Sequence, residues 1–191
     1  MPALKIALII GSTRKGRFAD KPVQWIQELA SKRQDFELEV VDLRDFPMPF
    51  FDEPGPPVAV SPTNDVAQRW GKTLGGFDGF IFVTPEYNHG PAAVLKNALD
   101  YAFKEWNLKP AAFVGYGAVG AARAVQVLRL TAATLRMVSV SKAVHIGMIE
   151  FQGIRGGKPF TDFPYLEQAA AAMFDELALL APVLRAARAA T

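Results

Sequence analysis

The stretch TPEYNHGPAAVLKNALDY, residues 84 to 101, places a carboxylate, a phenol, an amide and an imidazole in consecutive positions. Glu86 and His89 have the chemistry of a general acid–base pair. The chain has no cysteine, however, and the G-x-S-x-G signature that carries a hydrolase nucleophile does not occur in it. The more coherent interpretation is a cradle for a planar ring that forms hydrogen bonds. Simple packing of Tyr87 against its neighbours is the alternative.

A second candidate site is the turn GSTRKGR, residues 11 to 17, which follows an apolar run. It offers hydroxyl and guanidinium groups just before a predicted helix, whose N-terminus attracts anions. The four side chains are those of Ser12, Thr13, Arg14 and Arg17. Positive charge at that end of a helix opposes the helix dipole, and a bound phosphate would relieve the conflict. Phosphate binding is therefore favoured over an ordinary helix cap with solvated charges.

The third candidate is the turn GYGAVG, residues 115 to 120, which matches the pattern G-x-G-x-x-G. A dinucleotide-binding motif of this type follows the first strand and has an acidic residue about 20 positions later. Here the turn follows the fourth predicted strand, and residues 130 to 149 contain no Asp or Glu. We interpret it as a turn that exposes its backbone to a flat ligand. A purely structural glycine turn is the alternative.

The three turns interrupt a regular alternation of two kinds of segment. Apolar runs are predicted as strands at residues 4–10, 36–43, 79–83, 111–114 and within 138–146. Segments with helical spacing are predicted as helices at about residues 19–33, 63–74, 90–103, 120–137 and 165–188, the last bent or broken near Pro182. Such an alternation predicts a parallel sheet with helices on both faces, whose ligands bind at the carboxyl ends of the strands.

Composition limits the class of protein. Half of the 191 residues are apolar and the formal net charge is +2, so we expect one domain, residues 1–191, that binds no nucleic acid. His89 and His145 are the only histidines, and no His/carboxylate cluster has metal-site spacing, so no metal is expected. The apolar run near the N-terminus is too short for a membrane span and no cleavage site follows it. A cytoplasmic protein without a membrane partner is expected.

The three turns together resemble a known family. The combination of GSTRKGR, TPEYNHGPAAVLKNALDY and GYGAVGAAR is similar to the NAD(P)H-dependent FMN reductase family over about residues 4 to 150. The resemblance implies a flavodoxin-like fold, with a doubly wound five-stranded parallel sheet of strand order 2-1-3-4-5 and helices on both faces. The family includes quinone, azo-dye and chromate reductases.

The resemblance also implies cofactor-binding residues and no catalytic ones. In the family the first turn grips the FMN phosphate, which carries over to Ser12, Arg14 and Arg17, with Phe18 behind them and Thr13 in the same turn. The PEYN turn lines the isoalloxazine ring, which carries over to Pro85, Glu86, Tyr87 and Asn88. The glycine turn approaches the pyrimidine side of the ring, which implicates Tyr116 and Gly117. Backbone N–H groups at Gly117 and its neighbours are expected to stabilise charge on the reduced ring.

Two positions depart from the family pattern. Arg17 and Ala19 stand where many members have a Ser-x-Asn pair, so we expect Arg14 and Arg17 both to bind the phosphate. Tyr116 stands where many members carry a serine, which is expected to alter access to the ring.

The resemblance implies an FMN-dependent oxidoreductase that takes hydride from NAD(P)H and passes electrons to free flavin, quinones or similar small-molecule acceptors. The cofactor performs the difficult step, which explains why no catalytic dyad is visible. Two alternatives stay open: a non-enzymatic electron carrier of flavodoxin type and an FMN-dependent regulatory module. Carriers of that type resemble a strongly acidic protein with a Thr-rich phosphate loop, and this chain has neither feature.

The helix predicted at residues 90–103 is apolar on more than one face. Its apolar residues are Ala92, Val94, Leu95, Ala98, Leu99, Ala102 and Phe103. A helix of this kind needs burial on two sides, and a sheet covers only one. We therefore expect a homodimer or a homotetramer. The alternative is that neighbouring helices or Trp106 cover the second face.

Overall fold

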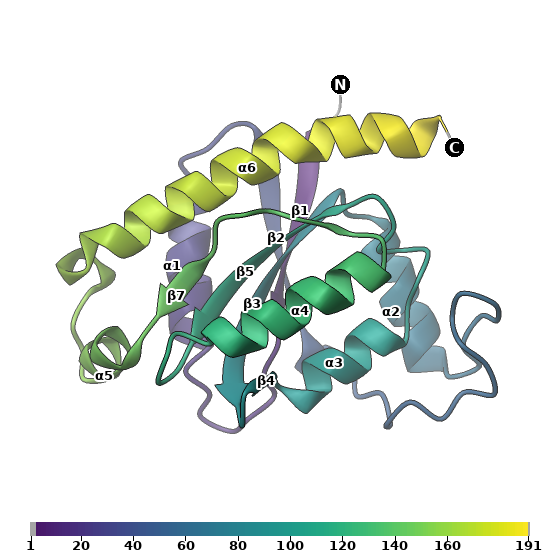
Figure 1. Cartoon of the computed structure of the whole chain (residues 1–191), viewed down its shortest axis with the longest axis horizontal. Helices are drawn as coiled ribbons and strands as arrows, with labels where there is room; N and C mark the ends of the chain where they lie inside the picture. The colour runs from purple at the N-terminus through teal and green to yellow at the C-terminus, as the bar shows by residue number, and fades with distance from the viewer. Residues whose placement is uncertain (1–2, 191) are drawn as a thin grey trace.

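The computed structural model describes residues 3–190 and has a parallel sheet at its centre (Figure 1). The longer strands are β1 (Leu4–Ile10), β2 (Phe36–Asp42), β3 (Gly79–Tyr87) and β5 (Pro110–Tyr116). With the short strand β6 (Val138–Ser139) they form the order β2-β1-β3-β5-β6, and each neighbouring pair is parallel. Because β5 is the fourth of these strands along the chain and β6 the fifth, the predicted order 2-1-3-4-5 is confirmed.

The strands form because each apolar run is buried on both faces of the sheet. In β1, for example, Ile6 and Leu8 enter one hydrophobic cluster, whereas Ala7 and Ile9 enter the other. Successive side chains of a strand point to opposite faces, so one strand contributes to both clusters.

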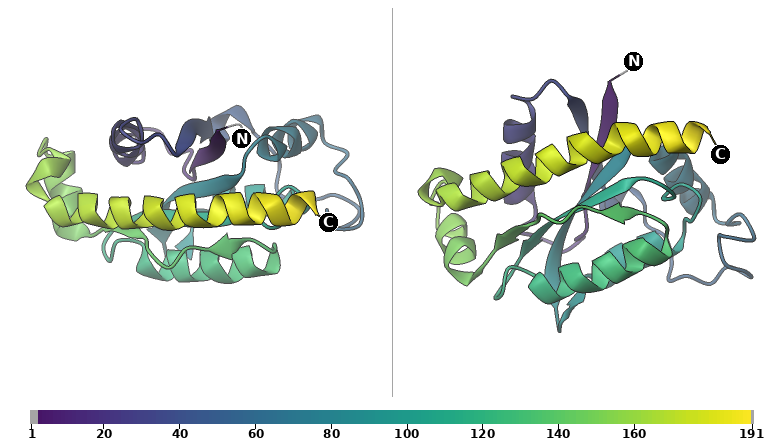
Figure 2. Two further views of the ribbon diagram at one scale, coloured as in Figure 1. Left: turned by 90° about the horizontal axis from the view of Figure 1, so that it is seen from above. Right: turned by 45° about the horizontal axis from the view of Figure 1, so that its top comes forward.

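Helices cover both faces, as predicted. One cluster packs the sheet against α1 (Asp20–Ala30) and α6 (Pro164–Ala189). The other cluster packs it against α2 (Asp65–Gly75), α3 (Ala93–Asp100) and α4 (Ala122–Thr134). Figure 2 shows that α6 runs along the length of the molecule as one helix through Pro182, so the break offered as one alternative does not occur. No helix among residues 3–190 is long and apolar enough to cross a membrane.

The fifth predicted strand is present in two pieces, β6 and β7 (Val144–Ile146), which both pair with β5. Between them the chain leaves the sheet and its polar groups find side-chain partners. Arg129 donates to the carbonyl groups of Val140 and Ser141, and the carboxylate of Glu176 accepts from Ser141. These contacts satisfy the backbone groups that a continuous strand would have paired.

Four elements were not predicted. Helix α5 (Met148–Arg155) follows β7, and two short 3₁₀ helices span Leu43–Asp45 and Phe160–Asp162. Strand β4 (Gly90–Pro91) pairs antiparallel with the end of β3, where a direct entry into a helix was expected. Two of these elements, α5 and β4, lie at the carboxyl end of the sheet (Figure 1).

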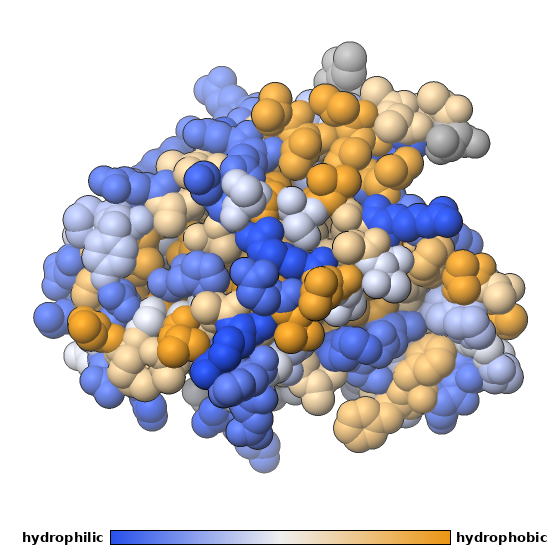
Figure 3. Space-filling model, viewed as in Figure 1, coloured by the Kyte–Doolittle hydropathy of each residue, from blue (hydrophilic) through white to orange (hydrophobic). Residues whose placement is uncertain are grey.

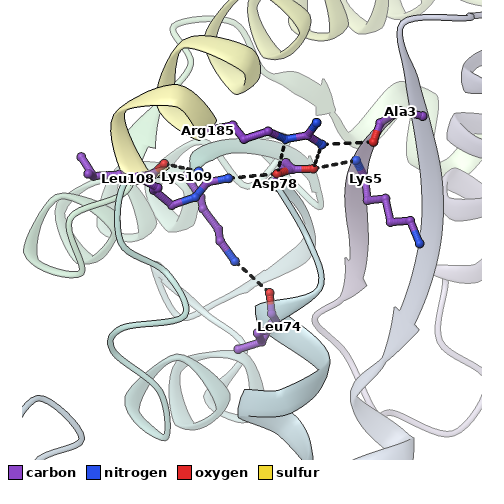
Figure 4. A network of polar contacts seen from close by, with 8 residues as sticks. Ala3, Lys5, Leu74, Asp78, Leu108, Lys109 and Arg185 are labelled. Carbon is purple, nitrogen blue, oxygen red and sulfur yellow. Dashed lines mark hydrogen bonds and ion pairs between the residues drawn. The ribbon is translucent and has the colours of Figure 1, made fainter. Parts of the chain in front are cut away.

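At the opposite end of the sheet, Asp78 joins the last turns of α6 to the starts of β1 and β3 (Figure 4). Its carboxylate accepts hydrogen bonds from Arg185 Nε at 2.8 Å, Arg188 Nη2 at 2.9 Å and the backbone N–H of Lys5 at 3.0 Å. Burial works to raise the pKa of Asp78, but these hydrogen bonds and charges outweigh it and lower that pKa. The network closes the amino end of the sheet with charged groups, so the carboxyl end is left for ligands.

The buried Lys109 belongs to the same end of the molecule. Its ammonium group donates to the carbonyl of Leu74 at 2.9 Å (Figure 4). The same group lies 5.3 Å from the centre of the Phe80 ring. Burial lowers the pKa of Lys109 to about 8. These two contacts therefore stabilise the ammonium group of Lys109 in its buried position.

Candidate functional site

A cavity of about 280 Å³ lies at the carboxyl ends of β1, β3 and β5. All the residues assigned from the sequence line it except Thr13 and Asn88. The lining residues that were assigned are Ser12, Arg14, Arg17, Phe18, Pro85, Glu86, Tyr87, Tyr116 and Gly117. The three turns therefore converge, as a switch point between parallel strands requires.

The lining also contains residues that sequence reasoning missed, namely Gly16, Lys21, Phe151 and Arg155. Lys21 lies one helical turn after Arg17 in a segment correctly predicted as a helix, so spacing was a usable signal for it. Phe151 and Arg155 come from α5, which the sequence pattern did not indicate. No local signal placed that helix beside the first turn.

Arg17 lines the cavity, but its guanidinium group is engaged by protein acceptors. Nη1 donates to Asp42 at 2.7 Å and to the carbonyl of Ser12 at 2.8 Å, and Nε donates to Asp20 at 2.7 Å. A second bond from Nη2 to Asp42 makes that pairing bidentate. The Arg17 side chain is only 5 % exposed. The expectation that Arg17 binds phosphate directly is therefore corrected: Arg17 holds the first turn in place.

The cationic groups of Arg14, Lys21 and Arg155 differ from that of Arg17 in their contacts with the protein. They line the same cavity, and their side chains form no hydrogen bond or ion pair with any residue among 3–190. Three like charges without partners repel one another, and an anion between them would be stabilised. The cationic end of the cavity is thus built from three segments: the loop of residues 11–17, the N-terminal turn of α1 and the C-terminal turn of α5.

The cavity has an aromatic wall made by Phe18, Tyr116 and Phe151. The ring centres of Phe18 and Phe151 are 4.5 Å apart, and the rings of Tyr116 and Phe151 are nearly parallel at 6.4 Å. Burial raises the pKa of Tyr116 well above its usual range, so the phenol stays protonated. Tyr116 therefore joins an apolar surface, which suits a flat ligand better than a small polar side chain would.

The PEYN segment is the end of a β-hairpin. Tyr87 pairs with Gly90, and the two residues between them, Asn88 and His89, have φ angles of 50° and 70°. Two successive positive φ angles define the type I′ turn, which matches the twist of a hairpin. The hairpin explains why the connection is longer than a plain strand-to-helix turn. It also places Asn88 at the tip and away from the cavity lining.

The carboxylate of Glu86 is bound to the N-terminus of α4. It accepts from the backbone N–H of Arg123 at 3.1 Å and from Arg123 Nε at 2.6 Å, and Arg123 also contacts His89 Nε2 at 2.8 Å. Burial works to raise the pKa of Glu86, but the Arg123 hydrogen bond and the α4 backbone outweigh it and lower that pKa. Glu86 is therefore a fixed anion, and the Glu86/His89 acid–base pair considered from the sequence is not formed.

Gly117 brings the backbone of the third turn to the cavity. Its φ of 141° is accessible to glycine and strained for other residues. Its N–H donates to the carbonyl of Ile146 at 3.1 Å. The expectation that N–H groups of this turn stabilise charge on a ligand is therefore corrected for Gly117, whose N–H is bonded to β7, and stays a prediction for its neighbours. A cationic end, an aromatic wall and a backbone-lined turn fit an elongated molecule with a phosphate and a flat ring.

The sequence profile of the NADPH-dependent FMN reductase family matches residues 4–150. The chain belongs to this family. It is 41% identical over 135 residues to an NAD(P)H-dependent FMN reductase of Schizosaccharomyces pombe, covering 70% of this chain and 68% of that protein. It is 35% identical over 147 residues to a 2-hydroxy-1,4-benzoquinone reductase of Burkholderia sp, covering 73% of this chain and 76% of that protein. The resemblance found in the three turns is confirmed.

Among solved structures, the fold is similar to that of FerB, a flavoenzyme NAD(P)H:(acceptor) oxidoreductase from Paracoccus denitrificans. The TM-score is 0.73 at 24% sequence identity, and the match covers 93% of this chain and 99% of that chain. An NADH:FMN oxidoreductase has a TM-score of 0.66 at 18% identity, with 93% and 89% coverage. Family membership makes the chain an oxidoreductase that uses FMN with NAD(P)H as the electron donor.

We expect Arg17→Met to destabilise the fold, because Asp42 would lose its bidentate partner. The free energy of unfolding, measured by urea titration at pH 7, should fall by about 1–3 kcal/mol. Burial opposes ionisation of Asp42, but the Arg17 and Arg44 hydrogen bonds outweigh it and lower its pKa in the folded state. The stabilisation is therefore present above the unfolded pKa of about 3.9. It is lost as the pH falls through the folded-state pKa.

The matched control is Lys96→Met, which removes an exposed ion pair with Asp100. Such a pair contributes about 0.3–0.5 kcal/mol. An Arg17→Met protein as stable as the wild type at pH 7 would show that the Arg17–Asp42 pair does not hold the first turn.

Proposed function

We propose that the protein transfers hydride from NAD(P)H to FMN bound in this cavity and passes the electrons to free flavin, quinones or similar small acceptors. The observation that carries the proposal is the convergence of partnerless cations, an aromatic wall and a glycine turn on one cavity in a chain of the FMN reductase family. Bound FMN supplies the redox chemistry, and the protein binds and orients the reactants.

We assign the phosphate end of FMN to the first turn, with Ser12 and Arg14 at the cavity and Thr13 beside them. Arg14 is the charged contact because its guanidinium group has no partner among residues 3–190. Arg17 is a positioning residue that acts through the Ser12 carbonyl and the start of α1. Phe18 supports the turn from the aromatic wall.

We assign the ring end to the hairpin and the third turn. Pro85 and Tyr87 line this end together with Gly117. Glu86 holds the hairpin against α4 through Arg123, which fixes the distance between the two turns that face the ring. Tyr87 is 39% exposed, so its phenol is available to a ligand at the mouth of the cavity.

The acceptor proposal rests on the cavity wall. Phe18, Tyr116 and Phe151 present aromatic surface and no free acid or base, which suits flat, weakly polar molecules such as quinones. Relatives named for quinone reduction include a 2-hydroxy-1,4-benzoquinone reductase and an NAD(P)H:quinone oxidoreductase of Solanum tuberosum. We further propose that residues 1–191 act as one FMN-binding domain in the cytoplasm, where NAD(P)H is available.

The function is tested with the purified protein and added FMN. We expect uptake of one FMN per chain with quenching of its fluorescence, followed by oxidation of NADPH or NADH when a benzoquinone or free flavin is supplied. Each nicotinamide is compared with each acceptor under steady-state conditions. A protein that leaves FMN fluorescence unchanged at high concentration would refute the proposal.

Arg14→Ala should weaken FMN binding about 10- to 100-fold, because a charge-assisted hydrogen bond contributes about 1.5–3 kcal/mol. Riboflavin, which lacks the phosphate, should bind almost equally to both proteins, as measured by fluorescence quenching. Lys15→Ala is the matched control, since Lys15 is exposed in the same turn and does not line the cavity. Equal losses for FMN and riboflavin would mean that Arg14 supports the fold and does not contact the phosphate.

We also propose that the chain forms a homodimer or a homotetramer, although much of the apolar surface of α3 is covered within the chain. The apolar residues Leu95, Ala98 and Leu99 of α3 are buried within the chain, and the fully buried Trp106 packs there, donating to the carbonyl of Leu99. Exposed apolar side chains remain at Phe50 and Phe51, in the segment hydrogen-bonded to Asn97 of α3, and on α6. Figure 3 shows apolar side chains gathered over the C-terminal half of α6, where Leu179 and Val183 are exposed.

The assembly is tested by light scattering after size-exclusion chromatography at micromolar concentration. We expect a mass at least twice the chain mass of 20.8 kDa. Val183→Lys should shift the mass toward that of the monomer, because a charge would enter the apolar interface. A monomeric wild-type protein would refute the assembly.

A further inference from the structure

A second hollow adjoins the flavin cavity between α1 and α5. It has a volume of about 300 Å³ and shares one lining residue, Lys21, with the flavin cavity. Lys158 lines the hollow, and Arg155 lines the flavin cavity at the end of α5. We call Lys21, Arg155 and Lys158 the basic rim. None of the three side chains forms a hydrogen bond or an ion pair with a residue in the described range 3–190.

The basic rim provides more positive charge than FMN can balance. A phosphate monoester carries about two negative charges at neutral pH. Arg14 and the basic rim supply four positive charges, and Glu28, which lines the hollow, offsets one of them. Glu86 does not enter this balance because Arg123 pairs with it, and the charges of Arg17, Arg44, Asp20 and Asp42 cancel one another. About one positive charge is left over, which favours a second anion beside the flavin phosphate.

The walls of the hollow suit a nucleotide. Trp25 and Phe160 stack face to face at 4.4 Å with an interplanar angle of 4°, and Phe160 is half-buried at the surface of the hollow. The Glu28 carboxylate accepts a hydrogen bond from Gln24 at 2.9 Å, so an amide and a carboxylate stand on the same wall. An aromatic surface next to cationic side chains is the combination that binds a base and its phosphate.

We propose that the basic rim binds the 2′-phosphate at the adenosine end of NADPH. The inference rests on the proposed function, because it is the electron donor that brings a second phosphorylated group to the flavin cavity. Lys21 lines both spaces, so they adjoin at the first turn of α1. We place the dinucleotide across this turn, with its adenosine end in the hollow and its nicotinamide end in the flavin cavity. NADH has no 2′-phosphate, so the basic rim favours NADPH as the donor.

Within the basic rim, Lys158 is the residue that is separate from the flavin cavity. Lys158 lines only the hollow, whereas Arg14 lines only the flavin cavity. Arg155 and Lys158 both lie outside residues 4–150, the part of the chain that the family profile matches. The basic rim therefore depends on α5 and the turn after it.

The test uses the FMN-loaded protein and two fragments, 2′,5′-ADP and 5′-AMP, which differ by the 2′-phosphate. Calorimetry should show that the wild type binds 2′,5′-ADP at least about 10-fold more tightly, since one charge-assisted contact is worth that much. Lys158→Met should remove most of this difference and leave FMN affinity unchanged. Glu28→Gln should increase the difference between the two fragments, because a carboxylate that lines the hollow is neutralised.

Lys32→Met is the matched control, since Lys32 is exposed just after α1 and lines neither space. In turnover, Lys158→Met should raise the KM for NADPH about 10-fold and leave the KM for NADH within about twofold. The proposal is overturned if the wild type does not distinguish the two fragments, or if Lys158→Met leaves the distinction intact. Either result, obtained with normal FMN uptake and NADPH oxidation, would leave the proposed function standing.

Discussion

The pairing of Arg17 with Asp42 and Asp20 decides which charges the site presents. One guanidinium group joins the end of β2, the first turn and the start of α1, and it is nearly inaccessible to solvent. Because its donors are used inside the protein, Arg17 shapes the turn and does not compete for the ligand. The accessible positive charge then comes from Arg14, Lys21 and Arg155, which belong to three different elements. We therefore expect an anionic ligand group to lie beside these three side chains, because Arg17 is used to hold the turn.

A second ionic contact, between Glu86 and Arg123, holds the opposite side of the cavity in place. Glu86 bridges the β3–β4 hairpin and the N-terminus of α4, with Arg123 between Glu86 and His89. The carboxylate satisfies backbone N–H groups that a helix start leaves without partners. The same contact prevents Glu86 from exchanging protons with a substrate, since its pKa is lowered. A residue type associated with catalysis is therefore used here to position a turn, and the redox step is left to the cofactor.

The two ends of the sheet differ in a way that supports this arrangement. Asp78 and the arginines of α6 tie the amino ends of the strands together, so that end is closed by protein contacts. At the carboxyl end the connections are longer and carry the hairpin, the glycine turn and α5. Parallel sheets commonly bind ligands at this end because the loops there are free to diverge. In this chain helix α5 contributes Phe151 and Arg155 to the site.

The sequence by itself determined the parallel sheet, its strand order and the three turns that meet at the cavity, because apolar runs and glycine-containing turns are local patterns. It also predicted that Ser12, Arg14, Pro85 and Tyr116 would lie together. Only the tertiary structure decided how each side chain is used. Arg17 meets Asp42, Glu86 meets Arg123, and the N–H of Gly117 meets Ile146, across separations of 25, 37 and 29 residues. No local pattern encodes such pairings, since they depend on which charged and polar groups the packed sheet and helices bring within hydrogen-bond distance.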